Sequence, residues 1–190
     1  CLNLLETPTT GEILYHGNNI ADAKVNAPKY RSRVGMVFQS FNLFNNMTVL
    51  ENCMVGQVKV LKKGKEESKQ KAMYYLEKVG MAPYINAKPR QLSGGQKQRV
   101  AIGSAIASDK EVLIFDEPTS GLDYHHMIEV ATNLITLSEM GKTIFIITHD
   151  PELIAQCCNY FMFIEHGKIK WSGGWSTDTR KYLCDFFSVI

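Results

Sequence analysis

A serine and two glycines stand where a helix is expected to begin. Residues 92–96 read LSGGQ and precede a helical pattern that runs to about Ala107. The first turn of a helix carries free N–H groups and the positive end of the helix dipole, so it attracts phosphate groups. A side chain on Gly94 or Gly95 would obstruct the close approach of such a group. An ordinary turn is the weaker interpretation of this motif.

Two carboxylates follow a strongly apolar strand pattern. Residues 112–115 read VLIF, and Asp116 and Glu117 come directly after them. At this place P-loop NTPases hold Mg²⁺ and activate water with acidic side chains. Asp116 is therefore a candidate Mg²⁺ ligand, and Glu117 is a candidate general base for an attacking water. By itself, an apolar strand followed by two acids is common, and it also fits a strand end without a catalytic role.

Strand and helix patterns alternate around these residues. Apolar runs predict strands over residues 12–16, 34–39, 112–115, 143–147 and 160–164. Helical periodicity predicts two helices within 48–79, separated at Gly64, and others over 93–107, 127–140 and 152–158. Apolar strands that alternate with helices indicate an α/β fold with a mostly parallel sheet covered on both faces.

The C-terminal tail has a helical pattern of its own. Tyr182, Phe186 and Ile190 recur at helical spacing within residues 175–190. This spacing predicts a short helix that packs on the core or on a partner.

Composition fits one globular domain, with room for a subdomain. The 190 residues are 45% hydrophobic and 21% charged, and 21 Lys and Arg face 19 Asp and Glu. That balance is too even to mark a nucleic-acid or anionic-membrane binder. Five cysteines without CxxC spacing favour reduced thiols, and the neighbouring His125 and His126 fit a helix surface better than a metal site. No apolar run approaches the length of a membrane span, so any membrane role requires a partner.

The order and spacing of three motifs resemble the ABC ATPase family. LSGGQ at residues 92–96 is followed by DEPTSGLD at 116–123 and, after the next strand, by THD at 148–150. The resemblance covers nearly the whole chain and implies a P-loop NTPase-like fold, here N-terminally truncated. Its expected parts are an incomplete ATPase core over residues 1–40 and 109–172, a helical subdomain over 41–108 and a C-terminal tail over 173–190.

The resemblance also implies a role for each matching residue. Gln39 would touch Mg²⁺ or water and sense the membrane subunit. The signature would close on the γ-phosphate of an ATP held by the opposite subunit, and it comprises Ser93, Gly94, Gly95 and Gln96. Asp123 would lie at the dimer interface, and His149 would contact the γ-phosphate. Asp116 would bind Mg²⁺, and Glu117 would be the general base.

The phosphate-binding loop of the family, G-x-x-x-x-G-K-[ST], has no complete copy in these residues. Gly141, Lys142 and Thr143 match its end, but Thr136 stands where the first glycine is required. In relatives, a segment resembling residues 1–13 follows directly on the helix of this loop. We therefore expect the 190 residues to begin past the loop and to bind ATP poorly by themselves.

The favoured function is ATP hydrolysis that drives a transporter. The resemblance implies a head-to-tail pair of ABC subunits on transmembrane permease subunits, with the chain cytoplasmic at the inner face of the membrane and without nucleic acid. One alternative is a non-hydrolysing fragment that donates its signature to a partner. Another is a DNA-maintenance ATPase, but these insert long coiled coils between Gln39 and Ser93, where only the 53 residues 40–92 lie here.

The two halves of the chain resemble different importers. Residues 1–13 and 34–54 resemble polar amino-acid importers, whereas residues 107–131 and 141–169 resemble energy-coupling-factor ATPases, which take up vitamins or metals. The stretch LSGGQKQRVAI at 92–102 is similar in both groups, so a recombination or assembly error could join the halves there. A divergent single lineage is the alternative.

Overall fold

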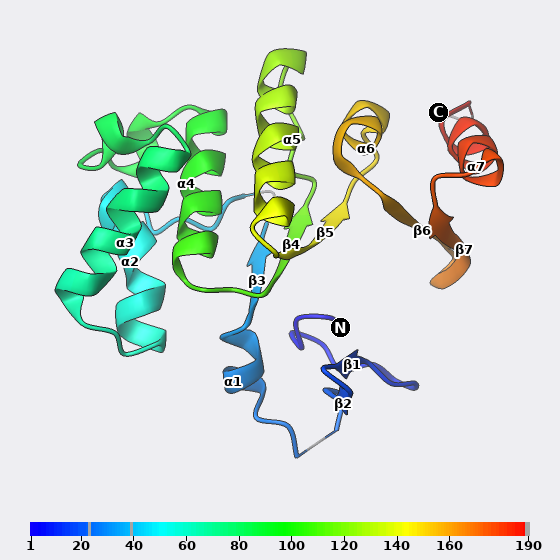
Figure 1. The fold of residues 1–190 in the computed structure, drawn as a ribbon, viewed down its shortest axis with the longest axis horizontal. Coiled ribbons are helices and arrows are strands. Elements are labelled where there is room, and N and C mark those ends of the chain that lie inside the picture. Colours follow the sequence, from blue (N-terminus) through cyan, green and yellow to red (C-terminus); the bar gives the residue numbers. More distant parts are fainter. Residues whose placement is uncertain (23, 39, 189–190) are drawn as a thin grey trace.

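A short parallel sheet lies at the centre of the chain, in a computed structural model that describes residues 1–22, 24–38 and 40–188. The sheet has the strand order β3-β4-β5, formed by β3 (Val34–Val37), β4 (Val112–Asp116) and β5 (Thr143–Ile147) (Figure 1). Two antiparallel pairs flank it in sequence: β1 (Leu14–Tyr15) with β2 (Asn18–Asn19), and β6 (Tyr160–Glu165) with β7 (Lys168–Gly174).

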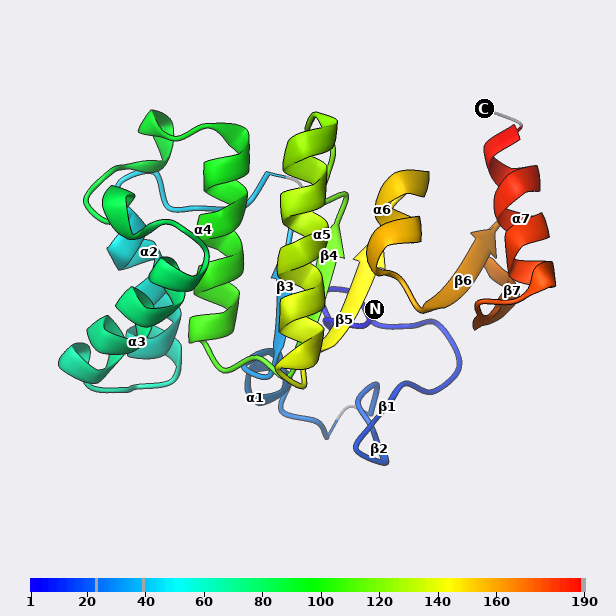
Figure 2. The same ribbon diagram turned by 45° about the horizontal axis from the view of Figure 1, so that its top comes forward.

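Helices occupy most of the remaining chain. Those before the signature are α1 (Ala27–Arg31), α2 (Val49–Val55), the π-helical turn η1 (Gly56–Val60), α3 (Lys65–Lys78) and the short 3-10 turns η2 (Ala82–Tyr84) and η3 (Pro89–Gln91). Those after it are α4 (Gly94–Ala107), α5 (Tyr124–Glu139), α6 (Pro151–Cys157) and α7 (Thr177–Ser188). Figure 2 shows α2, α3 and α4 packed side by side, with α5 next to α4.

A continuous hydrophobic core joins the helices to the sheet. Leu76 of α3, Val100 of α4 and Phe115 of β4 are fully buried in it. Leu134 of α5 and Leu153 of α6 extend the core to the other helices. The three central residues of β4 are buried, as expected for a parallel strand with neighbours on both sides.

The register of the sheet brings the carboxyl ends of its strands to one edge. Phe115 pairs with Val37 on one side and with Ile146 on the other, and Asp116 pairs with Ile147. The residues that follow β4 and β5 therefore emerge side by side. This edge is where α/β proteins bind ligands.

Most predicted elements are confirmed, with changed ends. The strand expected over 143–147 has these bounds, and Gly64 separates α2 and η1 from α3, which it precedes. The strand expected over 12–16 is shortened to β1, which turns back into the unpredicted β2. The strand expected over 34–39 ends at Val37, and Gln39 lies outside the described residues.

The prediction that residues 160–164 join the parallel sheet is wrong. In the described part of the chain, β6 pairs with β7 alone, and the pair is antiparallel. The reason is the two-residue turn after Glu165, in which His166 (φ 49°) and Gly167 (φ 73°) both take left-handed backbone angles. Two such residues in a row form the tight turn that returns a strand on itself.

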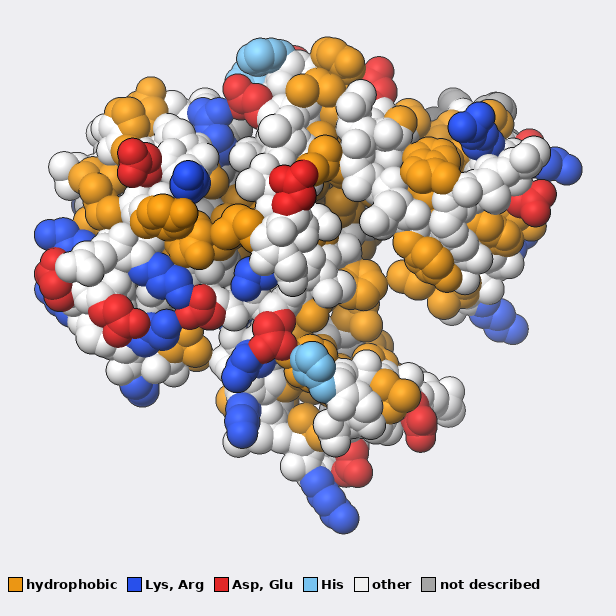
Figure 3. All heavy atoms as spheres, in the orientation of Figure 1, with side chains coloured by type: hydrophobic (Ala, Val, Ile, Leu, Met, Phe, Trp, Pro, Cys, Tyr) orange, Lys and Arg blue, Asp and Glu red, His pale blue; other side chains and the backbone are white. Residues whose placement is uncertain are grey.

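The expectation of a sheet covered on both faces is also wrong beside β5. A cavity of about 1240 Å³ lies between β5 and the β6–β7 hairpin, with Ile147, Met162 and Ile164 among its lining residues. Figure 3 shows a hollow that separates the rest of the molecule from the lobe formed by β6, β7 and α7.

The predicted C-terminal helix is present as α7, and it packs on the hairpin. The Tyr182 ring lies 5.4 Å from the Trp171 ring and 5.8 Å from the Phe163 ring, and Phe186 lies 6.1 Å from Phe163. Ile190, which the spacing also placed on this helix, is outside the described residues. The tail therefore forms a small aromatic cluster of its own.

Candidate nucleotide site

The first part of the site is the pair of carboxylates that ends β4. Asp116 is the last residue of the strand, and the N–H of Glu117 donates to the Ile147 carbonyl at 2.9 Å. Glu117 then turns out of the strand with φ 48°, a left-handed angle that is uncommon for a residue with a side chain. This turn holds the Glu117 side chain over the end of β5.

There Glu117 meets the histidine that follows β5. Nδ1 of His149 lies 2.8 Å from Oε1 of Glu117, and since a carboxylate only accepts, the imidazole donates this hydrogen bond. The hydrogen bond and the negative charge of Glu117 raise the pKa of His149 above its ordinary value. The structure thus places His149, which was predicted to contact the γ-phosphate, against Glu117, which was predicted to be the general base.

A second hydrogen bond ties the two loops together. Thr119 Oγ1 donates to Oδ2 of Asp150 at 2.7 Å, and Oδ1 of Asp150 accepts the N–H groups of Glu152 and Leu153 at the start of α6. Sequence reasoning quoted Asp150 without giving it a role. The signal was present, because an aspartate followed by proline is a common way to begin a helix.

The signature begins α4 with a capping box. Ser93 Oγ accepts the N–H of Gln96 at 3.3 Å, and Gln96 Oε1 accepts the N–H of Ser93 at 2.9 Å. The N–H groups of Gly94 and Gly95 belong to the first turn, which has no intrahelical acceptor for them. A Cβ on Gly94 would meet nothing within 4 Å, so packing does not require a glycine there. An open backbone with unsatisfied donors fits the predicted phosphate contact.

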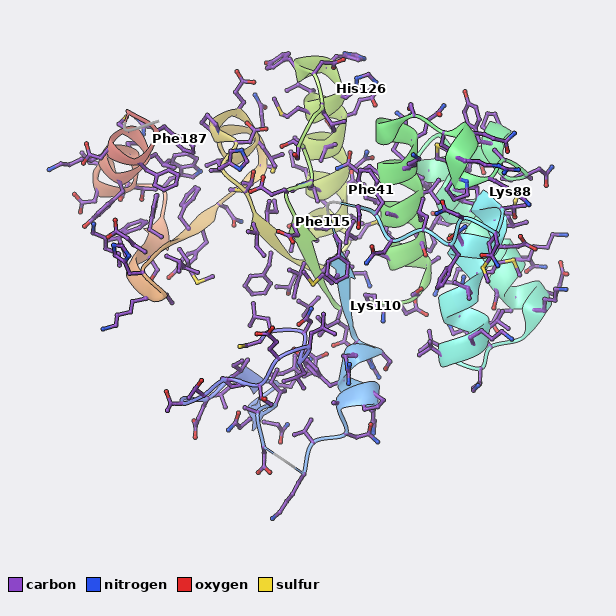
Figure 4. The ribbon with its side chains drawn as sticks, turned by 180° about the vertical axis from the view of Figure 1, so that it is seen from behind. Phe41, Lys88, Lys110, Phe115, His126 and Phe187 are labelled. Atoms are coloured by element: carbon purple, nitrogen blue, oxygen red, sulfur yellow. The ribbon has the colours of Figure 1, made fainter. Side chains whose placement is uncertain are left out.

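Asp123 connects the signature to α5. Its Oδ1 caps this helix, accepting the backbone N–H of His126 at 3.0 Å and lying 2.8 Å from the ring Nδ1. These two hydrogen bonds, the backbone one first, lower the pKa of Asp123. The His126 ring in turn lies against Gly95, where a Cβ would come within 3.2 Å of it (Figure 4). Asp123 and the signature are therefore neighbours.

The predicted residues thus form two groups. Asp116, Glu117 and His149 lie at the ends of β4 and β5, whereas the signature residues and Asp123 lie at the starts of α4 and α5. In the part of the chain that the structure describes, no hydrogen bond or ion pair joins Ser93, Gly94 or Gly95 to the two carboxylates. Separate groups fit the expectation that the signature serves another subunit's nucleotide.

The carboxylate pair fits Mg²⁺ by its chemistry. Asp116 and Glu117 provide hard oxygen ligands, and within residues 1–22, 24–38 and 40–188 no group of three or more His, Cys, Asp or Glu side chains could enclose a metal. Mg²⁺ is usually held by one or two carboxylates, with waters and substrate phosphates as its other ligands. Asp116 is the residue that would bind it, and Glu117 would act through a water.

The parallel sheet, the carboxylates at its edge and the glycine-led helix define an ATP-binding domain of the P-loop NTPase-like α/β class. The family model described as "ABC transporter" matches residues 1–120. The chain therefore belongs to the ABC transporter family, as an ATP-binding domain.

Curated relatives of the chain are ATP-binding proteins of transport systems. The glutamine transport ATP-binding protein GlnQ of Bacillus subtilis (strain 168) is 43% identical over 169 residues, which are 89% of this chain and 70% of that protein. The glutamate/aspartate import ATP-binding protein GltL of Escherichia coli (strain K12) is 43% identical over 168 residues, 88% of this chain and 70% of that protein.

Solved structures agree with the fold. The ATP-binding cassette MJ0796, as a dimer bound to ADP and Pi, has a TM-score of 0.77 and 31% identity, covering 90% of this chain and 76% of that one. CbiO1 of Clostridium perfringens, part of the ABC transporter complex cbiONQ, has a TM-score of 0.82 and 29% identity, covering 98% and 72%. No helix of the described residues has both the length and the apolar character needed to cross a membrane.

Proposed function

We propose that the chain is the ATP-binding and ATP-hydrolysing subunit of an ABC importer for a polar amino acid. The observation that carries the hydrolytic part is the Glu117–His149 contact at the carboxyl ends of neighbouring parallel strands. The names of GlnQ and GltL support the amino-acid part.

In this proposal each residue has one task. MgATP, when bound, supplies the phosphoryl group and the divalent charge that stabilises its transfer. Asp116 binds the metal, and Glu117 accepts a proton from the attacking water. His149 donates its hydrogen bond to Oε1 of Glu117. Among the contacts of the described residues, Oε2 is therefore left for that water. His149 is exposed and can also reach a phosphate.

Gln39 would contact Mg²⁺ or water, as the family resemblance implies. It would also sense the permease. The residue boundaries 1–40, 41–108, 109–172 and 173–190 stay predictions as well.

The partners follow from the separation of the two groups of site residues. A signature that does not contact its own carboxylates suits a head-to-tail pair of ABC subunits, in which Ser93, Gly94 and Gly95 address the nucleotide of the other subunit. The dimer of MJ0796 supports such a pair. Permease subunits would hold the chain at the cytoplasmic face of the membrane.

A substitution of the general base tests the hydrolytic role. These residues would be joined to the phosphate-binding segment of GlnQ, and ATP turnover and binding would be measured. Glu117→Gln should retain ATP binding and lose about 100-fold or more of the turnover, because an amide cannot accept the proton. Turnover that survives in this variant would remove Glu117 from the role.

A second candidate is a chain that donates its signature without hydrolysing ATP. It is favoured by one sequence observation, since the 190 residues contain no complete G-x-x-x-x-G-K-[ST] motif. We propose that these residues alone bind MgATP weakly, and calorimetry with micromolar affinity would contradict this. Turnover measured alone and beside full-length GlnQ distinguishes donation from intrinsic hydrolysis.

The join between two importer lineages stays a hypothesis. GlnQ and GltL each align over nearly nine tenths of the chain, and cbiO1 aligns over 98% of it. Long-read sequencing of the source DNA tests the join, and a neighbouring permease gene would narrow the choice between amino acid, vitamin and metal.

A further inference from the structure

A buried glutamine connects the signature helix to the catalytic loop. Gln98 of α4 is 1% exposed, and its Nε2 donates a hydrogen bond to the carbonyl of Pro118. Pro118 comes directly after Glu117, the proposed general base. Sequence reasoning assigned no role to Gln98, because a glutamine on a helix usually faces solvent.

Stability alone does not explain a glutamine at this position. Oε1 of Gln98 is buried and has no hydrogen-bond partner among the described residues. A buried polar atom without a partner costs free energy, and such atoms are rare in native proteins. Burying Gln98 therefore costs free energy, and the hydrogen bond to Pro118 offsets this cost.

The two ends of this hydrogen bond are firmly held. On the helix side, Gln98 lies one turn after Gly94, and the next residue, Arg99, pairs with Glu129 of α5 at 2.6 Å. On the loop side, the flanking residues Glu117 and Thr119 are bonded to Ile147 and Asp150. A shift of α4 therefore acts on the backbone next to Glu117, which already holds an uncommon left-handed angle.

We infer that Gln98 is a positioning residue that fixes Glu117 against His149 and ties the signature of the chain to its own general base. The inference rests on the proposed function. In a head-to-tail dimer the signature serves the nucleotide of the partner, whereas Glu117 serves the nucleotide of its own subunit. The Gln98–Pro118 hydrogen bond then links the two nucleotide sites through a single chain.

A titration without nucleotide tests the positioning. The midpoint of His149 is followed by NMR in the unchanged chain and in Gln98→Leu. Loss of the hydrogen bond should release Glu117 and lower the midpoint toward the ordinary value of about 6.5. A folded Gln98→Leu chain with an unchanged midpoint would overturn the inference. If Gln98→Leu does not fold, Gln98→Met keeps the length of the side chain without the donor and is measured in the same way.

Gln57 provides a matched control. It is a glutamine with 0% exposure, its Nε2 donates to the carbonyls of Cys53 and Ser68, and its Oε1 also has no partner in the described residues. It lies in the helical subdomain, away from Glu117. Gln57→Leu should leave the His149 midpoint unchanged, and an equal shift in both variants would reduce Gln98 to a packing role.

Mixed dimers, in which the chain is joined to the phosphate-binding segment of GlnQ, give a second test. One subunit carries Glu117→Gln, so only the other hydrolyses ATP. Gln98→Leu placed in the active subunit should lower turnover about 10-fold, as expected for one lost hydrogen bond. The same change placed in the inactive subunit, whose signature serves the active site, should leave turnover within about two-fold.

The opposite pattern in the mixed dimers would show that Gln98 supports only the signature, and it would overturn the inference. Absence of turnover in every dimer, including those with Gln98, would instead contradict the proposed function. The His149 titration still decides the role of Gln98 in that case.

Discussion

The side of the sheet toward β3 and the side beyond β5 differ in how far their apolar residues are buried. On the first side, Val49, Leu76, Val100 and Phe115 are fully buried, and Thr48 caps α2 with a capping box. On the second side, the apolar strands β5 and β6 leave large side chains exposed, which include Ile147 (52%), Tyr160 (62%) and Ile164 (67%).

This difference separates sequence pattern from burial. An apolar run shows that a strand is suited to a covered face, but neighbouring elements decide whether the face is covered. The cavity between β5 and the hairpin lies where that cover is absent in the described residues. The helical side should therefore determine the global stability, and the hairpin side should open first.

Two phenylalanines of unequal burial give the largest expected contrast. Phe115→Ala should lower the free energy of unfolding by about 3–5 kcal/mol, because the ring is 0% exposed in β4. Phe186→Ala should lower it by less than about 1.5 kcal/mol, because that ring is 48% exposed on α7. Urea titration of both variants measures the difference, and equal losses would show that the two regions share one cooperative core.

Amide hydrogen exchange should rank the same regions. Amides of β4 and α4 should exchange roughly 100-fold or more slowly than those of β6, β7 and α7, since the second set can open without disturbing the buried core. Residue-resolved exchange at neutral pH checks this ranking. Equal protection in both sets would contradict an independent opening of the hairpin.

Helix caps should have global effects on one side and local effects on the other. Thr48→Ala removes an N-cap bonded to Glu51 and should cost about 1 kcal/mol of global stability. Ser176→Ala removes an oxygen that accepts the N–H of Thr179 at the start of α7, and it should loosen α7 without changing the unfolding midpoint. Circular dichroism during denaturation separates the two outcomes.

The smallest expected effect is a dependence on acid. Hydrogen bonds from Tyr15, then His16 and Arg33, lower the pKa of Glu111 to about 2. Because the pKa is lowered on folding, the stabilisation is present above the ordinary value of about 4.5 and is lost as pH falls toward 2.

Replacing Glu111 tests this dependence. Glu111→Gln should flatten the fall in stability between these pH values. Glu165→Gln should change the fall less, because the Lys170 hydrogen bond that lowers the pKa of Glu165 lies on the exposed hairpin. Thermal unfolding across this pH range measures both variants, and identical curves for Glu111→Gln and the unchanged chain would refute the assignment.

The sequence predicted the well-packed side better than the open side. The run VLIF before Asp116 predicted β4 because its burial and its pattern agree. Ser93 and Gln96 also predicted the start of α4, since capping depends on residues close in sequence. Such local signals can be recognised in the sequence alone.

The remaining features depend on contacts between distant residues or on unusual backbone angles. The antiparallel turn of β6 relies on left-handed angles at His166 and Gly167, which the apolar pattern of the strand does not indicate, so the pattern alone favoured a parallel strand. The role of Gln98 depends on Pro118, twenty positions away, and was not visible in either segment. No sequence pattern predicted the hydrogen bond between Glu117 and His149, although each residue had been assigned a role at the nucleotide.

The left-handed angle of Glu117 sets its proposed catalytic role against the stability of the backbone. A glycine would take φ 48° without the steric cost that a side chain brings, so Glu117→Gly would relieve the backbone while removing the proposed proton acceptor. Random mutagenesis that selects only for thermal stability would thus favour loss of the carboxylate at this position. Selection for the proposed ATP hydrolysis would restore the carboxylate together with its strain.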